Sequence, residues 1–69
     1  MDRDAVSSSN IMSAGYDPDS ETLEIEFKGG AVYQYYNVSQ HLYDEFQSAP
    51  SKGQFFHIYI KDSLPFSRV

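Results

Sequence analysis

The sequence predicts an α+β fold, in which a three-stranded antiparallel β-meander is followed by two helices that pack on the sheet. Three observations predict it: an alternating run at residues 22–28, the pair Gly29-Gly30 directly after it, and helical periodicity over residues 40–49. With 69 residues, the chain can form one domain with a small core. Six tyrosines and five phenylalanines supply large apolar faces, so we expect aromatic side chains to dominate that core.

The predicted domain begins after a polar segment. Residues 1–9 show no periodicity, and we expect a flexible lead-in there, followed by a single domain over residues 10–69. A short, mostly apolar run at residues 11–16 predicts the first strand. The turn cluster at residues 17–20 follows and contains Pro18, whose fixed φ favours a turn.

The second predicted strand has the clearest pattern in the chain. Residues 22–28 alternate strictly, which places the apolar and the charged side chains on opposite faces of the sheet: Leu23, Ile25 and Phe27 against Glu24, Glu26 and Lys28. Gly29-Gly30 predicts a hairpin, because glycine reaches the positive φ values of tight turns. Residues 31–36 then form the third strand.

The length of the hairpin loop decides where Tyr33 and Tyr35 point, because a slip of one residue turns every side chain to the other face. A two-residue loop places both tyrosines with the glutamates. A three-residue loop pairs Phe27 with Ala31 or Tyr33 and places both tyrosines on the apolar face. We favour the three-residue loop, since it hides the aromatic rings and exposes Gln34, and we interpret the two tyrosines as structural.

Two helices are expected after the sheet. Ser39 suits the N-cap of a helix over residues 40–48, whose apolar side chains fall within an arc of about 120°. Ser51-Lys52-Gly53-Gln54 matches a capping box and predicts a second helix that runs to Lys61, although the β-branched and aromatic residues leave a strand as the alternative. The second helix is apolar over about 200°, so we expect it to be buried or to face a partner. Residues 62–69 form a tail over the core.

Composition argues against several classes of function. The chain has no cysteine, which excludes disulfides and thiolate metal sites. It has no apolar run long enough for a signal peptide or a membrane span, so we expect a cytoplasmic protein with no membrane partner. Its two histidines, His41 and His57, lack the neighbours that catalysis or metal binding requires, and we expect no catalytic residue, no metal and no cofactor.

Charge is unevenly distributed along the chain. The net charge of −5 disfavours non-specific nucleic-acid binding, because phosphate contacts supply most of that affinity. Residues 50–69, however, hold Lys52, Lys61 and Arg68 against a single acid, Asp62. An anionic partner is therefore expected there. The second helix would begin with free N–H groups and a partial positive charge, although helix capping alone also explains Ser51-Lys52-Gly53.

Three stretches together resemble the KTSC domain family, and the resemblance covers about residues 6 to 68. They are Ser9-Asn10-Ile11 with Gly15-Tyr16-Asp17, Val32-Tyr33-Gln34-Tyr35 with Val38, and the run from Ser48-Ala49-Pro50 through Ser51-Lys52-Gly53-Gln54 to Phe55-Phe56. This family is named from its occurrence at the C-terminus of some lysyl-tRNA synthetases, and it also occurs as a free-standing small protein in bacteria and phages. The resemblance implies a fold unit and suggests RNA binding.

The sequence thus predicts a small, acidic, non-enzymatic binding module with two alternatives for its partner. The first alternative is RNA or another anionic ligand, bound near the second helix by Ser51, Lys52, Gly53, Phe56, Lys61 and Arg68. The second is a protein-interaction or homo-oligomeric module without a nucleic-acid role. It would use the excess apolar surface of the second helix or an open edge of the sheet.

Overall fold

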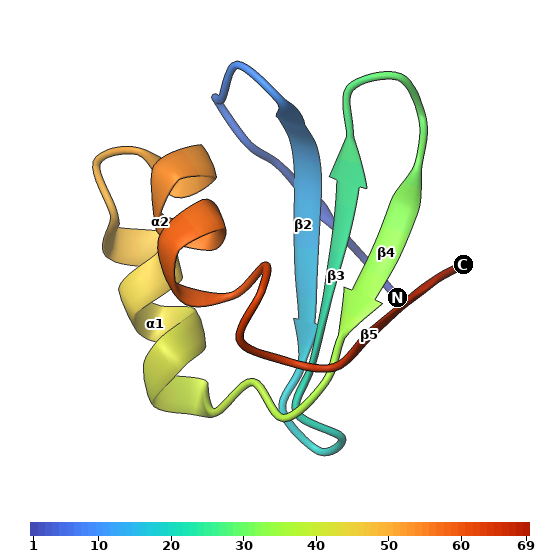
Figure 1. Cartoon of the computed structure of the whole chain (residues 1–69), viewed down its shortest axis with the longest axis vertical. Coiled ribbons are helices and arrows are strands. Elements are labelled where there is room, and N and C mark those ends of the chain that lie inside the picture. The colour runs from blue at the N-terminus through green and yellow to red at the C-terminus, as the bar shows by residue number, and fades with distance from the viewer.

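A computed structural model describes all residues, 1–69. It contains one antiparallel sheet of five strands in the order β1-β2-β3-β4-β5, with two helices on one face of it (Figure 1). The strands are β1 (Asp4–Ala5), β2 (Ile11–Asp17), β3 (Thr22–Phe27), β4 (Val32–Tyr35) and β5 (Phe66–Arg68). The helices are α1 (Gln40–Ser48) and α2 (Lys52–Tyr59). Neither helix has the length and apolar content that crossing a membrane requires.

The predicted three-stranded meander forms the centre of a larger sheet, so the prediction of three strands was wrong. Strand β1 pairs with β2, with Asp4 opposite Ala14, and β5 pairs with β4, with Ser67 opposite Gln34. These edge strands have two and three residues, too few to show the two-residue alternation that reveals a strand. The segment expected as a lead-in and the segment expected as a tail each contribute one strand.

The hairpin between β3 and β4 has the predicted three-residue loop. The N–H of Phe27 donates to the carbonyl of Ala31 at 2.8 Å, and Ile25 lies opposite Tyr33. Gly29 and Gly30 take φ values of 104° and 98°, which residues other than glycine rarely adopt. This register places both tyrosines of β4 on the same face as the apolar residues of β3, as predicted.

Both helices begin where the sequence predicts. The hydroxyl of Ser39 accepts a hydrogen bond from the N–H of Leu42 at 3.1 Å, and that of Ser51 accepts one from the N–H of Gln54 at 3.3 Å. The alternative of a strand for residues 54–61 was wrong. Residues 52–59 form helix α2, which buries Phe56 against Phe27 and Tyr35 of the sheet. Helix α2 ends two residues before the predicted Lys61.

The core lies between the helices and the sheet, and its centre is more aliphatic than we expected. The fully buried side chains include one aromatic, and the set is Phe46, Ile11, Leu23, Ile25, Ile60 and Val38. Three partly buried tyrosines, Tyr16, Tyr33 and Tyr43, pack against this centre. Tyr16, for example, stacks on Tyr43 at 4.3 Å and donates its hydroxyl to the carbonyl of Val38.

The face of the sheet without helices carries a polar network. The guanidinium of Arg3 pairs with Glu24 and lies 3.7 Å from a carboxylate oxygen of Glu26. Gln34 donates to Glu24 at 2.9 Å, and the Tyr36 hydroxyl contacts both the Gln34 side chain and the Ser67 hydroxyl on β5. The network therefore crosses the sheet from the N-terminal segment to the last strand.

Glu24 is the buried member of this network, with 6% of its surface exposed. Burial alone raises the pKa of its carboxyl group, because the low-dielectric surroundings disfavour the charge. The hydrogen bonds from Gln34 and Arg3, together with the charge of Arg3, outweigh that effect and leave the pKa of Glu24 below its ordinary value. Glu24 thus lies on the face opposite the apolar residues of β3, as predicted, and it is buried and paired there.

Candidate functional site

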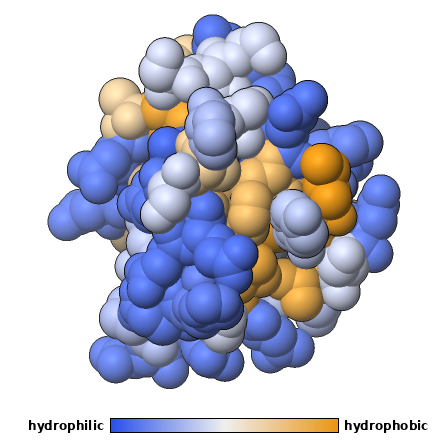
Figure 2. Space-filling view, turned by 90° about the vertical axis from the view of Figure 1, so that its left-hand side faces the viewer, coloured by the Kyte–Doolittle hydropathy of each residue, from blue (hydrophilic) through white to orange (hydrophobic).

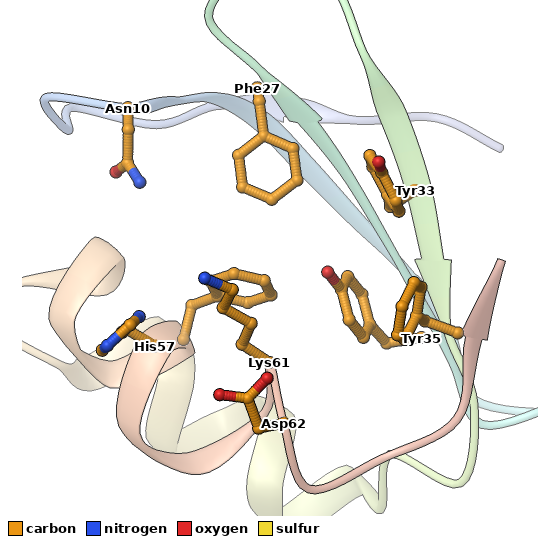
Figure 3. Close-up of a pocket in the computed structure, with 9 residues that line it drawn as sticks. Asn10, Phe27, Tyr33, Tyr35, His57, Lys61 and Asp62 are labelled. Atoms are coloured by element: carbon orange, nitrogen blue, oxygen red, sulfur yellow. The ribbon is translucent and has the colours of Figure 1, made fainter. Parts of the chain in front are cut away.

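An open groove lies between the C-terminal half of α2 and the aromatic face of strands β3, β4 and β5 (Figure 3). Its volume is about 340 Å³, which is within the range of sites that hold small ligands. The residues that line it are Asn10, Phe27, Tyr33, Tyr35, Phe56, His57, Lys61, Asp62 and Phe66.

Four aromatic rings in the groove form a closed set of contacts. The ring centroid of Phe27 lies 5.8 Å from that of Tyr33 and 5.4 Å from that of Phe56. Tyr35 closes the set, at 5.1 Å from Phe56 and 6.4 Å from Tyr33. Phe66 joins from β5, at 5.9 Å from Tyr33 and 5.5 Å from Tyr35. We call these five residues the aromatic ring set; their mutual packing holds the rings in place before any ligand arrives.

Exposure rises from one end of the aromatic ring set to the other. Phe56 and Tyr35 are 3% and 4% exposed and form the floor, while Tyr33 is half-buried and Phe66 is 56% exposed. Burial raises the pKa of the Tyr35 hydroxyl, so this group stays protonated at neutral pH and can donate a hydrogen bond. Figure 3 shows the Tyr35 hydroxyl directed into the groove. The site is closed below and open at the β4–β5 side.

Polar groups line the mouth of the groove. His57 lies on the groove side of α2, and Lys61 and Asp62 line the groove just after the helix ends at Tyr59. Figure 3 shows the Lys61 side chain running across the groove, with its ammonium group on the side of His57 and Asn10. The groove thus offers stacking surfaces, one cation, one carboxylate and an amide. No group of three or more metal-binding side chains is gathered in the structure.

The structure brings some predicted site residues together and separates others. Phe56 and Lys61 line the groove with the two tyrosines, which we had interpreted as structural only. Arg68 lies opposite Tyr33 in the β4–β5 pairing, and directly opposed residues share a face, so Arg68 is beside the groove. Ser51 and Lys52 lie at the other end of α2, where the Ser51 hydroxyl caps the helix itself.

Gly53 has a structural role that explains its place in the motif. A Cβ atom at this position would lie 2.8 Å from Oδ1 of Asn10 and 3.1 Å from the hydroxyl of Ser8. The absence of a side chain therefore lets the segment before β2 approach α2 closely, and this approach places Asn10 at the mouth of the groove. Gly53 at the start of α2 therefore contacts a residue that lines the groove, although the helix start itself lies outside the groove.

Sequence reasoning missed five of the groove residues: Asn10, Phe27, His57, Asp62 and Phe66. They come from separate segments, so no local spacing reveals them. One signal was available. The three stretches that resemble a known family supply Asn10, Tyr33 with Tyr35, and Phe56, and all of these meet in the groove.

Comparisons with known proteins support the family resemblance of the sequence. The family model of the KTSC domain matches residues 7–64. The crystal structure of a KTSC domain protein from Yersinia pestis superimposes with a TM-score of 0.92 at 45% sequence identity, and the match covers 99% of this chain and 96% of that one. A protein of Tsukamurella paurometabola is 43% identical over 56 residues, which are 81% of this chain and 84% of that protein.

A third kind of relative is much larger. The lysine–tRNA ligase of Nostoc sp. is 38% identical over 59 residues, which make up 86% of this chain and 10% of the ligase. The chain thus spans about a tenth of the length of the lysine–tRNA ligases that it matches. From the family model, the relatives and the solved structure together, we conclude that this chain belongs to the KTSC domain family.

Proposed function

We propose that this domain is a non-enzymatic binding module for single-stranded RNA, which takes an unpaired base in the groove. The observation that carries the proposal is the aromatic ring set, whose rings are open to solvent at Tyr33 and Phe66. Sheet-based RNA readers stack unpaired bases on aromatic side chains, and each such contact contributes about 1–3 kcal/mol. A groove of about 340 Å³ has room for one base against these rings.

The charges near the groove suit a phosphate on either side of such a base. Lys61 lies in the groove itself, and Arg68 lies beside Tyr33 at its open end. Lys52, at the start of α2, would contact a phosphate only if the bound RNA extended beyond the groove. Because the whole chain carries −5, we expect few phosphate contacts and modest affinity. With two contacts, log K should fall with log salt at a slope of about −1.4.

Kinship supports the choice of RNA over other anions. The relatives include lysine–tRNA ligases, in which a segment of about 59 residues resembles this chain. An enzyme that joins lysine to tRNA handles an RNA substrate. A small module with a stacking groove would add an RNA contact to such an enzyme, and the same groove would serve the free-standing domain.

The test is an NMR titration of labelled protein with short single-stranded RNA and with tRNA, at low and at moderate salt. We expect shifts at Tyr33, Phe56 and Lys61 that fade as salt rises. Tyr33→Ala should lose most of the binding. Tyr59→Ala is the matched control, because it removes a ring of the same kind from the other side of α2, and it should bind RNA normally. Unchanged spectra at low salt, or equal binding by both variants, would refute the proposal.

A further inference from the structure

Helix α2 has a second concave surface on the side that faces away from the groove. It has a volume of about 400 Å³ and lies between α1 and α2. We call it the helix-pair surface and define it by Asp44 and Glu45 of α1, Pro50 of the connection, and Phe55 and Tyr59 of α2. Phe55 and Tyr59 each lie two residues along α2 from His57, which borders the groove, so about 160° of rotation around the helix separates them from it. One helix therefore separates two hollows.

The floor of the helix-pair surface is apolar and held by the core. The ring centroids of Phe55 and Tyr59 are 4.7 Å apart, and Phe55 in turn packs at 6.1 Å against Phe46, which is fully buried. Tyr59 is nevertheless 54% exposed, and its neighbour Ile58 is 62% exposed. The space-filling view of the helix side shows apolar side chains gathered among hydrophilic ones (Figure 2). Fixed, exposed rings of this kind mark interaction sites.

The wall of the same surface is acidic. Asp44 and Glu45 are both exposed, and α1 contains no lysine or arginine. Helix α1 also ends beside this surface without a basic residue in its last turn, so the partial negative charge of its C-terminus is not neutralised from within. His41, which also borders this surface, contacts Glu45 at 2.7 Å. The hollow therefore attracts cations.

From this combination of an apolar floor and an acidic wall we infer that the helix-pair surface docks a basic amphipathic segment of a partner protein. An apolar side chain of that segment packs against Phe55 and Tyr59, and its lysine or arginine side chains pair with Asp44 and Glu45. A second copy of this chain does not fit, since two helix-pair surfaces would oppose acid to acid. RNA does not fit for the same reason. The inference is independent of the RNA proposal, because it uses the opposite side of α2.

The probe is a synthetic 14-residue amphipathic peptide of leucine and lysine, with a matched peptide in which glutamate replaces lysine. In an NMR titration of the whole chain at low salt, we expect the lysine peptide to shift the amides of Asp44, Glu45 and Tyr59. The aromatic ring set should stay unshifted, and the glutamate peptide should cause no shifts. Shifts that centre on the groove, or none with the lysine peptide, would overturn the inference.

Variants separate local recognition from general attraction to an acidic protein. D44N/E45Q should weaken peptide binding about five- to tenfold at low salt, since two charge pairs are lost. D19N/E21Q removes the same two charges from the exposed turn between β2 and β3, and it should bind the peptide as the wild type does. Equal weakening in both would show that net charge alone drives binding and would overturn the inference. Tyr59→Ala should bind the peptide weakly and keep RNA binding, while Tyr33→Ala should do the reverse.

Discussion

The two faces of the sheet hold the same strands by different means. On the helix-covered face, apolar side chains of β2, β3 and β4 pack against Phe46 and Ile60, and the aromatic ring set continues this packing toward the open edge. On the other face no helix covers the strands, and pairs of polar groups from Arg3 to Ser67 connect them. Removing a buried ring leaves a cavity, whereas removing one partner of the polar network leaves another polar group unpaired. The two faces should therefore respond differently to substitution.

The largest effect is expected on the helix-covered face, at Tyr35. Tyr35→Ala removes a ring that is 4% exposed and contacts three other rings of the set, and it should cost about 3–5 kcal/mol in unfolding free energy. Urea denaturation measures it. Tyr35→Phe keeps the ring and should cost about 1 kcal/mol or less, so it separates the contribution of the ring from that of the hydroxyl. An unchanged midpoint for Tyr35→Ala would mean that the ring is not packed.

The next effect concerns the centre of the polar face. Arg3→Ala leaves the buried carboxylate of Glu24 without its cation, and it should cost about 1–3 kcal/mol. The same substitution should loosen β1, which hydrogen exchange at the Val6 amide would report, since Val6 donates to Met12. In a double-mutant cycle with Glu24→Gln, the two losses should not add. Additive losses would show that the ion pair contributes little.

Acid should weaken the polar face before it weakens the packed one. The pKa of Glu24 is below its ordinary value in the folded state, so its contribution to stability is present above the ordinary value and is lost as pH falls through the folded-state value. Unfolding free energies from urea series at neutral pH and at steps below about pH 4.5 should therefore fall with acid. Glu24→Gln should reduce that dependence. The same slope in both proteins would contradict the assignment.

The smallest effect is expected at the edge of the polar face. Tyr36→Phe removes the hydroxyl that connects Gln34 on β4 with Ser67 on β5, at a position that is only half-buried, and it should cost about 0.5–1.5 kcal/mol. Amide exchange should become faster at Tyr36 and Val69, whose N–H groups bond across the β4–β5 pair. Exchange at the β2–β3 amides is the internal control. Acceleration spread over the whole sheet would instead indicate global destabilisation.

The parts that could be predicted from sequence are those with enough residues to show a period. Strand β3 alternates over six residues, α1 repeats its apolar positions over nine, and serine caps mark both helix starts. Strands β1 and β5 have only two and three residues, too few for an alternation to be recognised in the sequence. Alternation also placed Glu24 on the charged face of β3, but only the structure shows that Arg3 and Gln34 bond to it there.

The candidate site shows the same division. The sequence by itself narrowed the hairpin to two registers, and the one that we favoured, which turns Tyr33 and Tyr35 toward the helices, is the one that the structure shows. Only the tertiary structure decided that Phe66 and Asn10 line one groove with those tyrosines, and that Gly53 permits the approach of the segment before β2. It also decided that α2 lies between this aromatic groove and the acidic residues of α1. These features depend on where distant segments come to lie, and the packing of the whole chain determines that.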